Sequence, residues 1–361
     1  MLQGPASRLG PVTATGRHIV LARPEKNISG MLGEKIMKTL RCTLGVMGLL
    51  LIGISPTWTA TVDPHTPVSS DGRVFLPVHA LRQMPGVTGF KGLAAEGRAD
   101  DSQASFPAST DTPEEYALLL QRQPKTAPVG IESIIGSDIR SRFYTIDHPN
   151  RAVGLLTFNQ ATGSFICTGW LISPNTVATA GHCVHTGGPN GSFSTNVVFY
   201  PGRDGATSPF GSCAATTLFT VLGWTNSSDE QYDYGVIKLN CNIGNTVGWF
   251  GWWWQSSTLK KQHAQITGYP GDKPVGQQWG SFGVIGAAEK RQIFYRPDTF
   301  GGMSGSPVYQ PDREGSGCQV TCAMGIHAYG VHGSGNHASN NHGTRITKEV
   351  HNNFLAWIAA P

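Results

Sequence analysis

Short strand-like runs in the last two thirds of the chain are the feature that most constrains its fold. From about residue 133 onward, β-branched and aromatic residues form brief stretches such as Gly163–Ile172 and Asn196–Tyr200, and Gly, Pro and Asn separate them. The 361-residue sequence holds 46 Gly and 23 Pro but only 14% charged residues, a balance typical of turn-rich, mostly β proteins. This pattern predicts an antiparallel barrel or a sandwich.

The end of the chain has a different pattern. After Thr347, the apolar residues Val350, Phe354, Leu355 and Ile358 recur at helical spacing. Thr347 has a hydroxyl that can cap a helix N-terminus. We therefore predict a C-terminal helix after the strands.

Charge and cysteine content narrow the class of protein. The net charge is +4 and no long run of Lys or Arg occurs, so no nucleic-acid partner is expected. Of seven Cys, Cys42 stands apart and six lie between Cys167 and Cys322. An even number in an exported domain indicates disulfides, with the pairing left open. Cys318 and Cys322 are close together but lack a second close pair, so no structural metal is expected.

The first 60 residues predict export. The basic stretch Met37–Arg41 is followed by the apolar run 44–54, which is too short to cross a bilayer, and then by small residues. This order predicts a signal peptide over residues 37–60, with residues 1–36 upstream of the true start of translation. The alternative is a membrane anchor or a buried helix.

Residues 61–132 differ in composition from the strand-rich region after them. They contain no Cys and one clear helix signal, where Thr112 can cap, Pro113 suits the first helical position and Glu115 can complete a capping box. We interpret this segment as a propeptide. A small second domain is the alternative.

Three separated segments carry residues suited to nucleophilic catalysis. His182 lies in Thr-Ala-Gly-His-Cys, Asp233 precedes the mostly apolar run Val236–Leu239, and Ser304 lies in Gly-Gly-Met-Ser-Gly-Ser. Each segment alone has an ordinary structural explanation. Together, in the order His, Asp, Ser, they indicate the chymotrypsin class rather than subtilisins or α/β-hydrolases.

Each of these residue types answers a chemical need. A serine hydroxyl is a weak nucleophile near neutral pH, and an imidazole within hydrogen-bond reach can remove its proton. The Asp fixes the imidazole tautomer and stabilises the imidazolium. The glycines before Ser304 allow the N–H groups of Gly302 and Ser304 to point at one oxyanion, each such donor typically contributing about 3 kcal/mol.

From Ser133 to its end, the chain resembles the secreted bacterial glutamyl endopeptidases, chiefly the Bacillus type and more distantly the staphylococcal type. The resemblance implies a protease domain over residues 133–361 that is all-β, a chymotrypsin-like double six-stranded antiparallel β-barrel whose barrels meet near residue 255. It implies an extracellular monomer without cofactors. The expected partners are protein or peptide substrates and the enzyme's own propeptide, and no membrane partner is expected once the signal is removed. The motifs that carry the resemblance are Ser133–Asp138, Pro201–Arg203, Tyr232–Leu239, Asn245–Trp249, Gly268–Asp272, Asp298–Gly302 and Gly343–Thr347.

The resemblance also implies a reaction and a substrate. A triad of His182, Asp233 and Ser304 would hydrolyse peptide bonds through an acyl-enzyme, preferentially after Glu and less so after Asp. The substrate carboxylate would be bound by Thr299 and His327, whose hydroxyl and imidazole can donate hydrogen bonds.

In this family a disulfide ties two strands beside the catalytic His. A second pair is expected to close a small loop between Ser304 and His327, and two cysteines then remain for a third pair. Only the first pairing is supported by the family's geometry. The expected pairs are Cys167–Cys183, Cys318–Cys322 and Cys213–Cys241.

The resemblance places the start of the mature enzyme at Ser133. The residue before it is Glu132, the side chain that the predicted pocket should accept. Self-cleavage is therefore expected, and in the staphylococcal relative the freed α-amino group lies near the specificity pocket. The alternative is that another protease cuts this bond.

Other interpretations stay open at this point. Asp298 stands one residue before Thr299, where trypsin-like enzymes place the Asp that selects Arg or Lys. The resemblance implies that Asp298 points elsewhere, because the Bacillus-type relatives share an Asp at this place, and a trypsin-like preference is the alternative within the class. A catalytically inactive binding module and a cell-surface protein retained by residues 44–54 are alternatives from other classes.

Four histidines recur every five residues near the C-terminus. This spacing matches neither a helix nor a strand, so the sequence favours a polar loop with scattered histidines over a metal site, and no metal is expected. The residues are His327, His332, His337 and His342.

Overall fold

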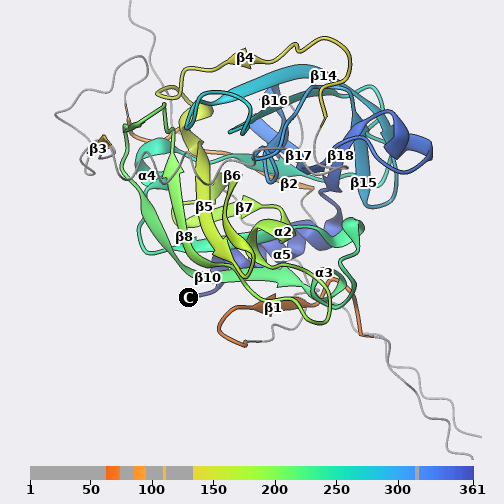
Figure 1. The fold of residues 1–361 in the computed structure, drawn as a ribbon, viewed down its shortest axis with the longest axis horizontal. Coiled ribbons are helices and arrows are strands. Elements are labelled where there is room, and N and C mark those ends of the chain that lie inside the picture. The colour runs from red at the N-terminus through yellow and green to blue at the C-terminus, as the bar shows by residue number, and fades with distance from the viewer. Residues whose placement is uncertain (1–61, 74–84, 95–108, 111–132, 314–316) are drawn as a thin grey trace, which may run out of the picture. The chain divides into compact units, whose positions relative to one another are not determined.

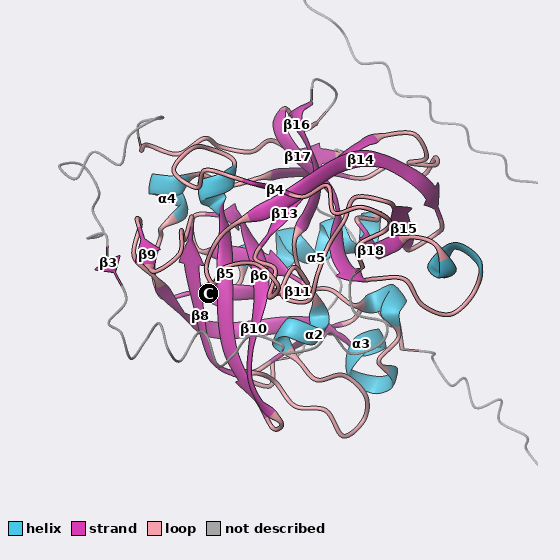
Figure 2. Cartoon of the chain, turned by 45° about the horizontal axis from the view of Figure 1, so that its top comes forward, coloured by secondary structure: helices cyan, strands magenta, loops and turns pink. Residues whose placement is uncertain are grey.

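The described part of the chain consists mainly of antiparallel strands, as Figure 2 shows. The computed structural model describes residues 62–73, 85–94, 109–110, 133–313 and 317–361. The predicted signal peptide and the helix predicted from Thr112 lie outside the described residues.

The first barrel contains six strands, each hydrogen-bonded to two others (Figure 1). Its order is β5–β6–β7–β11–β10–β8, and β8 pairs with both β10 and β5, which closes the barrel. The strands are β5 (Val153–Gln160), β6 (Gly163–Ser173), β7 (Thr176–Thr179), β8 (Thr195–Pro201), β10 (Cys213–Val221) and β11 (Gly235–Leu239).

Large apolar side chains fill this barrel. Leu156, Leu171, Val177 and Phe199 are all fully buried, and burial of one such side chain typically contributes about 1.5–3 kcal/mol. Gly154 makes room for this packing, because a Cβ there would lie 2.3 Å from the Phe199 ring. The β-branched and aromatic runs seen in the sequence are the strands of this core.

The second barrel repeats the architecture. Its order is β13–β14–β15–β18–β17–β16, closed by the pairing of β16 with β13. Together the two barrels confirm the predicted chymotrypsin-like double six-stranded fold. The strands are β13 (His263–Gly268), β14 (Trp279–Ala288), β15 (Gln292–Tyr295), β16 (Pro307–Arg313), β17 (Val320–Tyr329) and β18 (Asn341–Arg345).

Shorter strands lie at the edges of these sheets. Three of them, β1, β2 and β3, come from the segment interpreted as a propeptide. β1 (Pro67–Ser69) pairs with β10, and β2 (Gly86–Val87) pairs with β12 (Gly251–Trp253), which runs parallel to β17. The remaining pairs are β3 (Ser109–Thr110) with β9 (Thr207–Ser208) and β4 (Ser141–Arg142) with β14.

The helix α5 (Lys348–Ala359) ends the chain, as predicted. The Thr347 hydroxyl accepts a hydrogen bond from the Val350 N–H and so caps it. Phe354 and Trp357 are fully buried, and Trp357 stacks on Phe219 of the first barrel with ring centroids 5.9 Å apart. The helix therefore follows the second barrel in sequence but packs against the first.

The other helices are all short, and among the described residues no helix combines the length and apolar character needed to cross a membrane. They are η1 (Asn150–Ala152), α2 (Gly181–Val184), α3 (Leu222–Ser227), η2 (Glu230–Tyr232), α4 (Gly244–Val247) and η3 (Gly335–Ala338).

Three disulfides cross-link the domain, in the pairs that the sequence favoured. In the usual chain-entropy account, each stabilises the fold by restricting the unfolded chain. The pairs are Cys167–Cys183, Cys213–Cys241 and Cys318–Cys322.

Candidate active site

Pairing of β7 with β11 brings His182 and Asp233 together. Thr179 lies opposite Gly235 in this ladder, so the residues just beyond each strand meet at the same edge of the first barrel. The fully buried Asp233 lies with Oδ2 2.7 Å from His182 Nδ1, and its Oδ1 accepts the His182 backbone N–H at 2.8 Å. A carboxylate can only accept, so Nδ1 carries the ring proton and Nε2 keeps its lone pair.

The surroundings leave this pair little freedom to move. A Cβ on Gly181 would lie 2.9 Å from Asp233 Oδ1, which explains the glycine before His182. The Thr344 hydroxyl of the second barrel donates to the Asp233 carbonyl oxygen at 2.8 Å. The His–Asp pair is therefore held by both barrels.

Ser304 lies in the turn between β15 and β16 and packs against β6 and against α2, the short helix that contains His182. Its carbonyl oxygen accepts the Thr168 N–H at 2.8 Å and lies 3.8 Å from the sulfur of Cys183, the residue after His182. Gly305 has φ +88°, and a Cβ there would lie 2.2 Å from the Thr168 carbonyl oxygen and the Thr179 hydroxyl. Only glycine permits this approach, so the sequence around Ser304 fixes its position near His182.

Gly302 begins the turn that leads to Ser304. Its φ is +101°, and a Cβ would lie 2.5 Å from the Tyr269 carbonyl oxygen. The Thr168 hydroxyl donates to the Gly302 carbonyl oxygen at 2.9 Å. Met303 is fully buried in the core of the second barrel. The backbone of the predicted oxyanion hole is thus held by contacts on several sides.

The two residues of the predicted specificity pocket are both fully buried beside this turn. His327 on β17 accepts the Gly305 N–H through its carbonyl oxygen at 2.7 Å, and its own N–H donates to Ser306. Its Nδ1 lies 2.7 Å from the Tyr295 hydroxyl. The Thr299 hydroxyl has no hydrogen-bond partner among the described residues. Buried polar groups of this kind are suited to receive a polar ligand atom.

Burial sets the charge of His327. Desolvation of the ring, and to a lesser degree the imidazoles of His342 and His182, hold the pKa of His327 well below its usual value. The ring is therefore neutral near neutral pH and offers one N–H donor.

Asp298 is buried, and both its carboxylate oxygens are engaged. Oδ1 accepts the Ile135 N–H at 2.7 Å, and Oδ2 accepts the Ile139 N–H at 2.9 Å. The carboxylate thus binds the segment that comes after Ser133. This is not the geometry of an Asp that waits for a basic substrate side chain.

Ser133 lies against the same region. Its N–H donates to Asn341 Oδ1 at 2.8 Å, and its carbonyl oxygen accepts the Thr299 N–H at 3.3 Å. Its hydroxyl accepts the Val331 N–H. The predicted first residue of the mature chain is therefore in direct contact with one predicted pocket residue.

Sequence reasoning missed two side chains in this region. Tyr295 contacts His327 and Asn341 contacts Ser133, yet both lie in strands whose sequences give no sign of such contacts. The only sign of either residue was its position shortly before a motif of the resemblance, Asp298–Gly302 for Tyr295 and Gly343–Thr347 for Asn341.

The regularly spaced histidines are also arranged differently from the loop that the sequence favoured. His327 lies in the predicted pocket, whereas His332, His337 and His342 converge on Glu230 of η2. Glu230 was not singled out in the sequence, and it lies about 100 residues away from the histidines.

The arrangement of a His–Asp pair on one six-stranded barrel and a glycine-rich serine turn on the other defines the double-barrel class of serine endopeptidases. The sequence profile of the family described as Trypsin matches residues 147–358, more than half of the chain. The chain therefore belongs to the trypsin family.

Individual relatives narrow the likeness. A glutamyl endopeptidase of Bacillus licheniformis is 38% identical over 316 residues, which cover 87% of this chain and 94% of that protein. A Bacillus subtilis protein named extracellular metalloprotease is 34% identical over 302 residues, which cover 82% of this chain and 88% of that protein. A solved structure described as Glu endopeptidase in complex with MPD is 31% identical, with a TM-score of 0.54, and the match covers 63% of this chain and all of that one.

Proposed function

We propose that this protein is a secreted serine endopeptidase that cleaves peptide bonds preferentially after Glu and less readily after Asp. The observation that carries the substrate preference is the contrast between Asp298 and its neighbours. Asp298 accepts backbone N–H groups with both oxygens, while the next residue, Thr299, and His327 offer donors. The likeness to proteins named glutamyl endopeptidase supports the same preference.

The proposed reaction begins with proton transfer from the Ser304 hydroxyl to Nε2 of His182. The Ser304 oxygen attacks the carbonyl carbon of the substrate, and Asp233 stabilises the imidazolium that forms. The N–H groups of Gly302 and Ser304 stabilise the oxyanion. Proton transfer from His182 to the leaving amine gives the acyl-enzyme, which water then hydrolyses with the same base.

In the proposed pocket, a substrate carboxylate takes hydrogen bonds from the hydroxyl of Thr299 and from the ring of His327. When the Tyr295 hydroxyl donates to Nδ1 of His327, the neutral ring carries its proton on Nε2. That proton can then be donated to a carboxylate. A positively charged side chain would meet the same N–H donor, and the Asp298 oxygens already accept backbone N–H groups, which disfavours Arg and Lys.

Maturation is proposed to proceed by signal removal at about residue 60 and then cleavage between Glu132 and Ser133. The contacts of Ser133 with Asn341 and Thr299 support this boundary. Cleavage would turn the Ser133 amide into a charged amine beside the proposed pocket, and a positive charge there favours a substrate carboxylate.

A cleavage profile on a peptide library tests the preference most directly. Hydrolysis after Glu, blocked by a serine-directed fluorophosphonate that labels Ser304, is the expected result. A chelator is tested as well, because the Bacillus subtilis relative is named a metalloprotease. Activity that the chelator abolishes and the fluorophosphonate does not inhibit would contradict the serine mechanism. Cleavage after Arg or Lys would favour a trypsin-like enzyme, and an unlabelled, inactive protein would favour a binding module.

N-terminal sequencing of two secreted products, wild type and Ser304→Ala, tests maturation in a host that lacks other Glu-specific proteases. Self-processing requires that only the wild type begins at Ser133. A mutant that matures at the same bond would assign the cut to another protease, and a wild type that begins elsewhere would overturn the boundary.

A further inference from the structure

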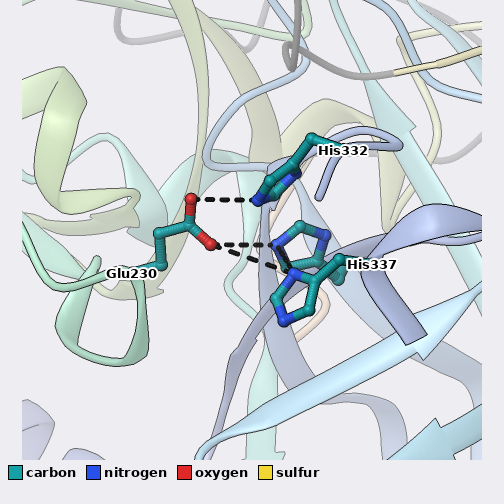
Figure 3. Close-up of side chains that lie close together, drawn as sticks. Glu230, His332 and His337 are labelled. Carbon is teal, nitrogen blue, oxygen red and sulfur yellow. Dashed lines mark hydrogen bonds and ion pairs between the residues drawn. The ribbon is translucent and has the colours of Figure 1, made fainter. Parts of the chain in front are cut away.

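Three imidazoles and one carboxylate converge beside the catalytic His–Asp pair. Figure 3 shows Glu230 facing the rings of His332 and His337. Glu230 Oε1 lies 3.2 Å from His332 Nε2, and Oε2 lies 3.4 Å from His342 Nε2 and 4.0 Å from His337 Nδ1. His337 Nδ1 and His342 Nε2 are 3.2 Å apart.

We propose that Glu230, His332, His337 and His342 bind one divalent transition-metal ion, and that this ion is Zn²⁺. Ligand atoms about 2.0–2.1 Å from a tetrahedral Zn²⁺ lie about 3.3 Å from one another. The two carboxylate oxygens lie 3.2–4.0 Å from the three ring nitrogens, and one donor atom from each residue falls within 4.8 Å of all the others. Imidazole nitrogens favour Zn²⁺, Cu²⁺ and Ni²⁺ over the oxygen-seeking Ca²⁺ and Mg²⁺.

The surroundings of His332 prepare it as a ligand. Its Nδ1 lies 3.1 Å from the Gly330 carbonyl oxygen. A carbonyl only accepts, so Nδ1 carries the proton and Nε2 presents its lone pair toward Glu230. Metal-binding histidines are typically oriented in this way by a hydrogen bond from the other ring nitrogen.

The chain segments around the cluster bring distant residues together. His337 lies in η3 and His342 in β18, and the backbone N–H of His332 donates to the His337 carbonyl oxygen, which closes the turn between them. The ring of Phe294 packs on the edge of His337 at 4.9 Å and stacks on His342 at 5.4 Å between ring centroids. The rings of His337 and His342 are thus held in place by packing.

The donor set makes this a structural site. Four protein ligands fill a tetrahedral ion and leave no position for a reactive water. Glu230 precedes β11 of the first barrel, whereas the three histidines belong to the second, so the ion would join the two barrels. The Tyr329 ring stacks on His342 at 5.2 Å and lies 5.9 Å from the His182 ring, which places this cross-link beside the candidate active site.

The test uses the secreted protein carrying Ser304→Ala, which prevents autolysis, stripped with a chelator and then titrated with ZnCl₂ or CoCl₂. We expect about one equivalent bound, the visible absorption of tetrahedral Co²⁺, and a melting temperature raised by about 5–10 °C at a free Zn²⁺ concentration 100 times Kd. CaCl₂ and MgCl₂ should give no such shift.

Glu230→Gln and His337→Gln, added to that protein, should each weaken Zn²⁺ binding at least about tenfold and remove the Co²⁺ spectrum. His263→Gln, at an exposed histidine of β13 outside the cluster, is the matched control and should bind as the parent does. Melting of each metal-free variant verifies that it is folded. Failure of the parent to bind Zn²⁺, or equal binding by the Glu230 and His337 variants, would overturn the proposal whatever the peptidase specificity proves to be.

Discussion

Two buried aspartates in this molecule bind different partners. Asp233 accepts hydrogen bonds from the ring Nδ1–H and the backbone N–H of the same histidine, whereas Asp298 accepts two backbone N–H groups from the segment after Ser133. Both are almost completely buried. The comparison teaches that residue type and burial do not assign a role, because the partner decides whether the carboxylate supports chemistry or holds the backbone.

The largest effect on activity should come from Ser304, the proposed nucleophile that Asp233 supports through His182. Ser304→Ala removes the proposed nucleophile and should lower turnover about a millionfold. The melting temperature should change little, because the substitution removes one oxygen atom. Steady-state kinetics on a Glu peptide measures the loss, and turnover close to that of the wild type would show that the triad is assigned wrongly.

Asp233→Asn should lower kcat by about 10⁴-fold, because an amide cannot hold the same tautomer of His182. Asp229→Asn is the control, since Asp229 lies in the same segment but caps η2 by accepting the Gln231 N–H. It should retain most activity. Equal loss in both variants would mean that the segment, rather than the contact with His182, is what matters.

Substitutions in the proposed specificity pocket should change substrate preference much more than they change the reactivity of Ser304. His327→Gln should lower kcat/KM for a Glu peptide by about 10²-fold, while the rate of fluorophosphonate labelling at Ser304 stays close to that of the wild type. Tyr295→Phe removes only the hydroxyl that contacts Nδ1 and should produce a smaller loss. Unchanged cleavage after Glu in His327→Gln would exclude His327 from the pocket.

The smallest effect on activity is expected at the second aspartate. Asp298→Asn should lower the free energy of unfolding by about 1–3 kcal/mol, because one of two backbone N–H groups loses its acceptor. Cleavage after Glu should stay within about tenfold of the wild type. Denaturant unfolding and the peptide library measure the two effects, and a preference for Arg or Lys that this substitution abolishes would reverse the comparison.

Much of this arrangement could be predicted from local sequence. The alternation of strands and turns, the terminal helix after Thr347 and the order of His182, Asp233 and Ser304 are all local or depend on chain order alone. The partners of Asp298 could not be predicted from local sequence, since they are backbone N–H groups about 160 residues away in sequence.

The histidine cluster shows the same limit more sharply. Its spacing of five matches no regular element, and the rings meet only because the chain turns through Gly333 and Gly335, both with positive φ. The carboxylate that they face comes from a separate segment before β11. A pattern within one segment of sequence cannot reveal a site assembled from two.

The edge strands β1 and β2 would affect the rate at which activity appears, because they would keep the cleaved propeptide bound to the protease domain. If the bond after Glu132 is cut, β1 still pairs with β10 and β2 with β12, Asn353 still donates to the His65 carbonyl oxygen, and Arg151 to that of Lys91. The first product would then be a two-chain complex, and these contacts would hold it together without a covalent link. Its dissociation, a step that dilution favours, would come after proteolysis as a separate event with its own rate.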